Sequence, residues 1–436
     1  MLLMKEDKKD IEIFFIILRE QAMGHKDIDH ILPLIYFLNQ SRTFNYKFKG
    51  ILFENELNFK KNLDPRVKFL FSFKNLDLKF LYRSYFMFRI KQFISSRHNS
   101  IIINLFKRVL KFYYKNKLNH IKKKFLKHKL KKYINASSTQ LLISLHQNKE
   151  AKFIVSCFKK INKKAKWVVA PHGTIMADNK MLFISDLDKK EKKIKNRNSI
   201  SADFILNASR HDLHGQLNVF KKNSFVVGLP RYCEEWLKLK SRFNLDGKKI
   251  SKNNGYKVRV LFLMPKRQLN IFFDELFRTI DFISSYKQID LILLDYDYIG
   301  DILPNYLIKR SNVRQKSIST EYSTSKLIDW SDIVFHVGTS MLFEFLAKNK
   351  IAIFPRYLTC NTLISEKYNV GYNLRNRDEL RDVCNEAVSS LYKLKKKYKN
   401  NFIRNNKKFI NDFVNANSKS VKVNLLKAFS KIGKNL

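Results

Sequence analysis

The 436-residue chain is 45% hydrophobic and 14% aromatic, the composition of a folded protein with room for two domains of ordinary size. Its 85 lysine and arginine residues against 38 acidic residues give a net charge of +47. This favours an anionic partner: nucleic acid, an acidic membrane face or a phosphate-bearing substrate. Four widely spaced cysteines without a CxxC pair argue against a zinc ribbon or a disulfide framework, and no apolar run is long enough to span a membrane. We expect a cytoplasmic protein, with peripheral contact to the inner face of the membrane as an option.

Short apolar runs alternate with amphipathic stretches in the first part of the chain, which is typical of an open α/β domain. Residues 11–18 predict a buried strand, a loop at 19–29 carries His25, and a helix follows as far as residue 38. Further strands are predicted at 49–53 and 67–73.

The composition changes in residues 78–149, which contain no Asp or Glu. Residues 107–132 hold twelve lysines or arginines, with apolar residues among them at helical intervals. We therefore expect a basic helical insertion at 78–135. Such helices can lie on an anionic bilayer, grip a nucleic acid backbone, or pack on the domain with their lysines in water.

The α/β alternation resumes near residue 140 and restarts after a polar linker at 244–256. Before the linker, strands are predicted at 141–145, 167–170, 202–206 and 225–227, and helices at 150–161 and 209–219. After it, strands are predicted at 258–264, 289–294, 332–337 and 351–354, and helices at 271–284, 325–330 and 341–348. The predicted fold is α/β, with two Rossmann-like domains at 1–243 and 257–377 facing across a cleft, and a helical C-terminal tail at 378–436.

The sequence Pro171-His172-Gly173-Thr174 follows a predicted buried strand. The proline fixes the turn, and the glycine lets a ligand approach the backbone. A neutral histidine at the carboxyl end of a strand can take a proton or donate to a phosphate. His172 is therefore the candidate catalytic base, and Gly173 and Thr174 are candidates to line the cleft beside it, where an acceptor substrate would bind. The alternative is a histidine that satisfies loop carbonyls.

A second candidate site lies in residues 331–356, which predict a strand, a small-residue turn, a helix and another strand. The turn is Gly338-Thr339-Ser340. Free amides at the start of the helix and two hydroxyl groups can face a phosphate there. The alternative is that Thr339 is a plain helix cap.

Four more residues are candidates to bind a phosphate-bearing ligand at this second site. Glu344 lies one turn into the helix, where it can accept hydrogen bonds from sugar hydroxyls or form an ion pair with Lys348. His336 precedes the turn, a place where a histidine is more often buried and satisfied. Lys266 and Arg267 follow the first strand of the second half, where a cation can neutralise a diphosphate.

Other chemistries have little support in the sequence. Asp295 and Asp297 end a predicted strand and could hold a divalent ion on a diphosphate, but the motif is weak, and we predict no metal site. The GxxxxGK[ST], GxGxxG, HExxH and GxSxG motifs are absent. No motif therefore supports a phosphate-loop nucleotidase, a classical dinucleotide enzyme, a zincin or a serine hydrolase.

Three segments together resemble GT-B glycosyltransferases of bacterial surface and capsular polysaccharide biosynthesis. They are Pro171-His172-Gly173-Thr174, the run Gly228-Leu229-Pro230-Arg231-Tyr232 up to Trp236, and residues 331–356. The match covers residues 140–372 in order and spacing. Wall-polymer glycerophosphotransferases and nucleotide-sugar 2-epimerases share this plan, and His-Gly-Thr resembles the former in particular. The basic insertion has no clear counterpart, and the donor turn lacks the glycine-rich run of many members.

The resemblance implies metal-independent transfer of a sugar from a nucleotide diphosphate to a glycan or lipid-linked acceptor, without a cofactor. The diphosphate would lie at the Thr339 helix, with Lys266 or Arg267 balancing its charge and Glu344 orienting the sugar or ribose. His172 would face it from the other half. Closure of the halves would exclude water.

His25 and Arg231 are further candidates for the acceptor side of that cleft. Two alternatives stay open. One is a polyol-phosphate transferase or a nucleotide-sugar 2-epimerase on the same fold. The other is a nucleic-acid-binding protein, but the basic residues are dispersed and no RNA-binding signature is present, so no nucleic acid partner is expected.

Overall fold

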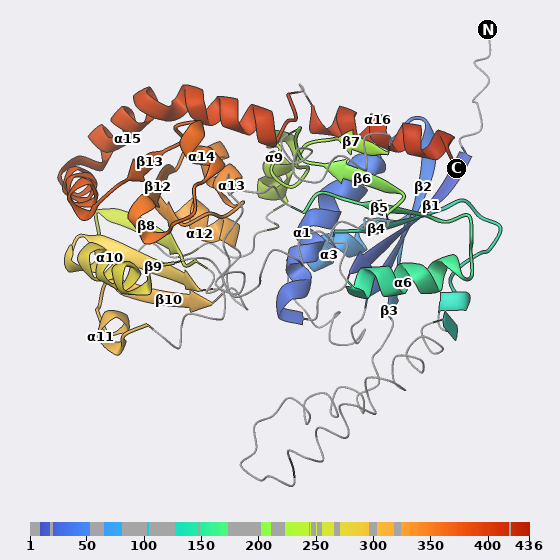
Figure 1. The fold of residues 1–436 in the computed structure, drawn as a ribbon, viewed down its shortest axis with the longest axis horizontal. Coiled ribbons are helices and arrows are strands. Elements are labelled where there is room, and N and C mark those ends of the chain that lie inside the picture. The colour runs from blue at the N-terminus through green and yellow to red at the C-terminus, as the bar shows by residue number, and fades with distance from the viewer. Residues whose placement is uncertain are drawn as a thin grey trace, which may run out of the picture.

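The computed structural model describes residues 9–17, 21–52, 65–80, 103, 127–128, 130–145, 149–172, 202–210, 223–243, 245, 250, 255–265, 271–295, 303–317, 324–417 and 420–436. Within these ranges the strands form two parallel sheets, one of seven strands and one of six. The two sheets and their helices lie side by side (Figure 1). The predicted fold class, two Rossmann-like α/β halves followed by long C-terminal helices, is confirmed.

The first sheet has the strand order β3-β2-β1-β4-β5-β6-β7, with every adjacent pair parallel. Its strands are β1 (Lys9–Ile17), β2 (Phe44–Leu52), β3 (Leu76–Phe80), β4 (Gln140–Ser144), β5 (Lys166–Val169), β6 (Phe204–Asn207) and β7 (Ser224–Val226). Alternate residues of β1 enter two different cores. Ile13 packs in the core that includes α1 (Gln21–Leu38), and Phe14 packs in the core that includes α6 (Lys149–Lys159). Helices therefore cover both faces of this sheet, as a parallel sheet requires.

The second sheet has the order β10-β9-β8-β11-β12-β13, also with parallel neighbours. Its strands are β8 (Val258–Leu263), β9 (Ile289–Asp295), β10 (Val313–Ser317), β11 (Ile333–His336), β12 (Ile351–Pro355) and β13 (Tyr372–Leu374). The helices around it are α10 (Phe273–Ser285), α11 (Asn305–Ile308), α12 (Thr324–Trp330), α13 (Leu342–Ala347), η3 (Arg356–Leu358) and α14 (Ile364–Lys367). Both sheets contain the 3-2-1-4-5-6 order of the Rossmann fold, so ligand sites are expected at the carboxyl ends of the strands beside β1/β4 and β8/β11.

Two long helices end the chain and join the halves. The helix α15 (Arg377–Phe413) runs along the second half, and α16 (Val421–Lys434) runs along the first (Figure 1). The ring of Phe429 in α16 lies 6.3 Å from the ring of Tyr46 in β2. The C-terminal tail therefore returns to the N-terminal sheet.

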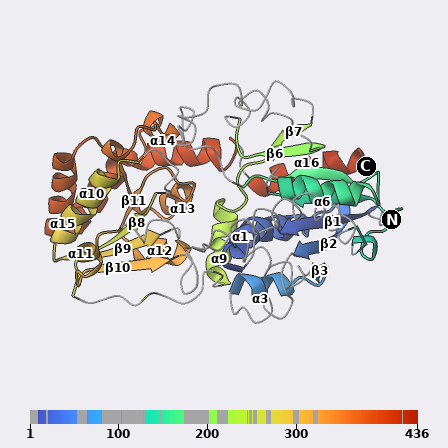
Figure 2. The same ribbon diagram turned by 60° about the horizontal axis from the view of Figure 1, so that its bottom comes forward.

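The helix α9 (Glu234–Arg242) lies between the two halves in both views (Figures 1 and 2). Its Trp236 packs against Tyr36 and Phe37 of α1, with ring centroids 5.9 and 6.5 Å away. The ring of Phe69 in α3 (Pro65–Phe71) is also 6.5 Å from Trp236. Helix α9 is thus anchored to the first half, and its other side is available to the second.

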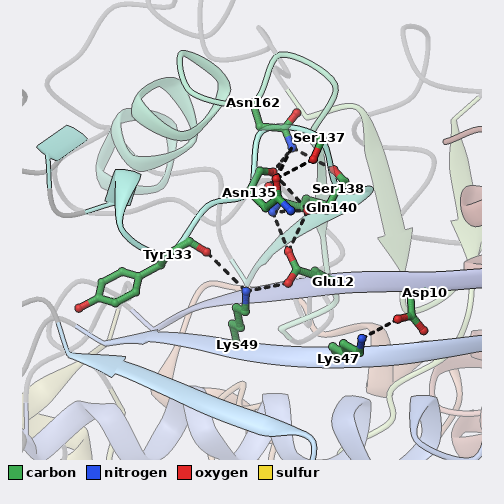
Figure 3. Close-up of polar contacts among 10 residues, drawn as sticks. All are labelled: Asp10, Glu12, Lys47, Lys49, Tyr133, Asn135, Ser137, Ser138, Gln140 and Asn162. Carbon is green, nitrogen blue, oxygen red and sulfur yellow. Dashed lines mark hydrogen bonds and ion pairs between the residues drawn. The ribbon is translucent and has the colours of Figure 1, made fainter.

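A polar network joins the middle of β1 and β2 to the amino end of β4 (Figure 3). Glu12 accepts hydrogen bonds from Lys49 at 2.7 Å, Gln140 at 2.7 Å and Ser138 at 2.9 Å. Asn162 donates to Gln140 at 2.9 Å. Burial raises the pKa of Glu12, but these donors outweigh burial and the net pKa is lowered. We assign this network a structural role, because the carboxylate of Glu12 accepts from three donors that join neighbouring strands.

The structure departs from the sequence-based elements in several places. Residues 67–73 do not form a strand: they belong largely to α3, and the strand is β3. The predicted loop at 19–29 is mostly the start of α1, and β10 was not predicted. The predicted helix at 209–219 and the basic insertion lie almost wholly outside the described residues. No helix in the described part of the chain is both long enough and apolar enough to cross a membrane.

Candidate functional site

A chain of contacts links the carboxyl ends of the two sheets. His172 follows β5, Arg231 follows β7 and Met341 follows β11. The ring of His172 lies 4.2 Å from the ring of His30 in α1, centroid to centroid, at an interplanar angle of 37°. Nε2 of His30 lies 2.8 Å from Nη1 of Arg231, and Nη2 of Arg231 lies 3.7 Å from Sδ of Met341. His172 is therefore linked through His30 and Arg231 to Met341, which directly follows the predicted donor turn.

Arg231 is the centre of this cluster. Besides His30, its guanidinium contacts Asp29 of α1, with Nη2 3.2 Å from Oδ2. The same Oδ2 accepts from Nη1 of Arg66 in α3 at 2.9 Å. The side chain of Asp29 is nearly buried, which raises its pKa, but Arg66, Arg231 and Lys240 outweigh burial and the net pKa is lowered. Asp29 therefore stays ionised and holds two arginines at one point.

The turn of residues 338–340 lies on the other side of Arg231. Gly338 has φ +75°, and an added Cβ would lie 3.2 Å from the side chain of Leu363. Oγ1 of Thr339 accepts a hydrogen bond from the backbone N–H of Met341 at 3.2 Å, which is a cap-like contact. The hydroxyl groups of Tyr232 and Ser340 are 3.5 Å apart. The strand β11, which precedes the turn, pairs with β8, so the turn lies at the switch point of the second sheet.

Glu344 forms the ion pair with Lys348 that the sequence analysis gave as the alternative, but its carboxylate is buried and a second lysine joins the pair. Glu344 is fully buried in α13, and Oε1 lies 2.9 Å from Nζ of Lys348 and 3.7 Å from Nζ of Lys240 in α9. Lys240 also donates to Ser325 of α12. Burial raises the pKa of Glu344, but Lys240 and Lys348 outweigh it, and the pKa falls below the ordinary glutamate value. A carboxylate held in this way between α9 and α13 has no face left for a sugar, so we leave it out of the proposed donor site.

His336 is part of the core of the second half. It is 1% exposed, and its ring lies 5.4 Å from Phe345 and 5.8 Å from Phe354. Burial lowers the pKa of His336 to about 3. We leave it out of the proposed donor site as well, because a neutral ring packed between two phenylalanines does not reach a ligand.

Several predicted residues lie outside what the structure describes. Lys266, Arg267, Gly173 and Thr174 are not among the described residues. The backbone of His25 belongs to α1, but its side chain is not described. Asp295 is buried at the end of β9, and Asp297 is outside the described ranges. Across the described side chains, no group of three or more His, Cys, Asp or Glu is placed to hold a metal ion.

The cluster also contains residues that the sequence analysis did not select. Asp29 and His30 are the charged or ionisable residues of a stretch of α1 that is otherwise apolar or aromatic and mostly buried, from Ile28 to Leu38. Two polar residues in an apolar helical face are a detectable signal, because a buried polar group needs a partner. Lys240 gave no comparable signal, since the surrounding LKLKSR has the pattern of a solvated helix.

Comparisons with known proteins bear on this arrangement. No protein-family model and no curated protein sequence matches the chain. A putative UDP-N-acetylglucosamine 2-epimerase from Listeria monocytogenes has a similar structure, with a TM-score of 0.57 at 10% identity, covering 99% of this chain and 98% of that one. A histidine variant of the wall teichoic acid polymerase TagF gives a TM-score of 0.51 at 14% identity, over 99% of this chain and 90% of that one.

The N-terminal domain of a trehalose-6-phosphate phosphatase from Candida albicans gives a TM-score of 0.50 at 11% identity, over 98% of this chain and 97% of that one. The chain has a GT-B-like fold. At such low identities the likeness is one of fold, shared by enzymes that act on different substrates. The chemistry of this protein therefore depends on its own residues and does not follow from the GT-B-like fold.

Proposed function

We propose that this protein is a transferase that takes a sugar from a nucleotide diphosphate donor and passes it to a hydroxyl group of a surface-polysaccharide or lipid-linked acceptor, without a metal. The observation that carries the proposal is the contact chain from His172 through His30 and Arg231 to the turn at residues 338–341. It supports the proposal because it connects an imidazole of one half, through His30 and Arg231, to the switch-point turn of the other half.

In the proposed reaction, His172 takes the proton of the acceptor hydroxyl while the hydroxyl oxygen attacks the anomeric carbon of the donor sugar. The bond between that carbon and the phosphate oxygen breaks, and the nucleotide diphosphate leaves with the electron pair. The diphosphate would lie against the turn of Gly338, Thr339 and Ser340, with Lys266 and Arg267 as candidates to balance its charge. Positive groups fixed beside the leaving phosphates lower the barrier without a metal.

The paired imidazoles favour a second candidate, a polyol-phosphate transferase on the same fold. His30 and His172 lie ring to ring beside Arg231, and two imidazoles with an arginine suit a reaction at phosphorus. In that case the acceptor oxygen would attack the phosphorus next to the polyol, and a nucleoside monophosphate would leave. The third option, a nucleotide-sugar 2-epimerase, needs no acceptor.

The decisive experiment has two stages. First, a panel of uridine, guanosine, cytidine and thymidine diphosphate sugars and of cytidine diphosphate polyols is screened for protection from thermal unfolding. Then the protecting donor is incubated with and without acceptor, and the products are identified by mass spectrometry. Release of nucleoside diphosphate supports sugar transfer, and release of nucleoside monophosphate supports polyol-phosphate transfer. Epimerised donor without acceptor supports the epimerase.

The variant His172→Asn tests the role of the imidazole in the same assay. We expect turnover to fall by about 100-fold or more, because a general base contributes 10²–10⁴-fold. His128→Asn is the matched control, since His128 is an exposed histidine outside the cluster. Wild-type turnover of His172→Asn would remove His172 from the proposed mechanism.

A further inference from the structure

Asp29 is 7% exposed, and it fixes the arginine that contacts His30. Its Oδ2 lies 2.9 Å from Arg66 and 3.2 Å from Arg231. Two guanidinium groups on one carboxylate oxygen give a rigid arrangement, because the planar fork of an arginine limits how it can turn.

The contact between Arg231 and His30 decides where the proton of His30 lies. Nη1 of Arg231 is 2.8 Å from Nε2 of His30. A guanidinium has N–H donors only and stays protonated in proteins. Nε2 must therefore be the acceptor, so His30 is neutral and carries its proton on Nδ1.

The protonation of His30 in turn affects His172. The two ring centroids are 4.2 Å apart, a distance at which two imidazolium rings would repel each other. Since His30 is held neutral by its arginine, the pair can accept one proton, and His172 is the ring that accepts it. Among the described residues, Asp29 interacts electrostatically with Arg66, Arg231 and Lys240, and Arg231 interacts in turn with Glu344.

We infer that Asp29 is a positioning residue: through Arg231 it holds His30 as the neutral Nδ1–H tautomer, and so makes His172 the proton-exchanging ring of the pair. The inference about the tautomer rests on the contacts alone. Its catalytic consequence rests on the proposed function of His172 as a base.

The test is nuclear magnetic resonance of the full chain with ¹⁵N-labelled histidine, in which the His30 and His172 signals are assigned by His30→Gln and His172→Gln. We expect wild-type His30 to show a protonated Nδ1 and an unprotonated Nε2 at neutral pH. We expect Asp29→Asn to give a mixture of tautomers, because Arg231 loses its anchor. Arg66→Lys is the matched control, since it keeps a positive charge on Asp29 and does not touch the bond from Arg231 to His30.

A wild-type His30 that is protonated on Nε2, or on both nitrogens, overturns the inference, whether or not any variant folds. So does an unchanged tautomer in a folded Asp29→Asn protein. If transfer activity is found, Asp29→Asn should lower kcat by about tenfold or more and shift its pH profile, with KM for the donor little changed. If His30 shows the expected tautomer, Asp29→Asn changes it and no donor is turned over, the proposed function fails and the positioning role of Asp29 stands.

Discussion

Replacing Glu344 by glutamine removes one negative charge from the contact between α9 and α13 and keeps the shape of the side chain. In the wild type, Glu344 is fully buried and Lys240 is 4% exposed, with 3.7 Å between the charged atoms. Neutralising one partner of a buried ion pair costs about 3–5 kcal/mol, because the other charge stays buried. We expect a loss of about 3 kcal/mol in the free energy of unfolding, the lower end of that range, since Ser325 still accepts a hydrogen bond from Lys240.

A double-mutant cycle separates this contact from its surroundings. Lys240→Met removes the buried cation, and the double variant with Glu344→Gln should be more stable than the sum of the two single losses predicts. Lys348→Met is the control for the second lysine, which is 21% exposed and also pairs with Asp329 at 2.8 Å. Its effect should be smaller, because a partly exposed pair contributes little.

The measurement is urea unfolding followed by the fluorescence of the three tryptophans, supported by circular dichroism. The pKa of Glu344 lies below the ordinary value, so its charge contributes fully above a pH of about 4.5 and is lost only as the pH falls toward the lowered pKa. The difference between wild type and Glu344→Gln should therefore be constant from about pH 5 to 8. A loss below about 1 kcal/mol, or weaker donor binding with unchanged stability, would refute this role and return Glu344 to the donor site.

Two other predictions concern stability. Burial lowers the pKa of His336 to about 3, so as the pH falls below 6.5 this histidine binds a proton in the unfolded chain but not in the folded protein. By pH 5 the free energy of unfolding is therefore lower by about 2 kcal/mol. The variant His336→Phe should lose that part of the pH dependence of the urea midpoint; an unchanged slope would contradict the burial argument. Gly228 has φ +91°, and an added Cβ would lie 2.3 Å from the carbonyl oxygen of Val414. Gly228→Ala should therefore lower stability by about 2 kcal/mol or more, while Gly255→Ala, with open space around it, should not; equal midpoints would refute the close approach.

The sheet strands were largely predictable because buried parallel strands are short apolar runs. Residues 289–294 and 351–354 were predicted as strands and form β9 and β12. The errors have physical causes. The apolar run at 67–73 is too short to distinguish strand from helix, and Pro65 at the first helical position favours the helix α3. The strand β10 (VRQKS) is polar because it lies at the edge of its sheet, so it gave no apolar signal.

The site was predictable only where a turn marks it. His172 and the Gly338 turn follow apolar strands directly, so sequence order alone put them at carboxyl ends of parallel strands. Asp29 and His30 sit inside a helix, and their role depends on Arg231, which is far away in the sequence and close in space. Lys240 and Glu344 are likewise far apart in the sequence and close in space. Long-range pairing of charges cannot be read from local patterns, because each residue taken alone has an ordinary solvated alternative.

These contacts also restrict how the two halves can move. Arg231, Tyr232 and Lys240 belong to one continuous segment, and each contacts the second half, at Met341, Ser340 and Glu344 respectively. Pulling the halves apart at this point would remove Glu344 and Ser325 from the buried cation of Lys240, so such a separation is costly. A rotation of the halves about this point keeps Lys240 and Glu344 in contact and does not carry that cost. We therefore expect any closure over a donor to pivot at the contact of α9 with α13. The switch-point turn then stays next to Arg231 and the imidazole pair, and the outer edges of the two sheets make the larger movement.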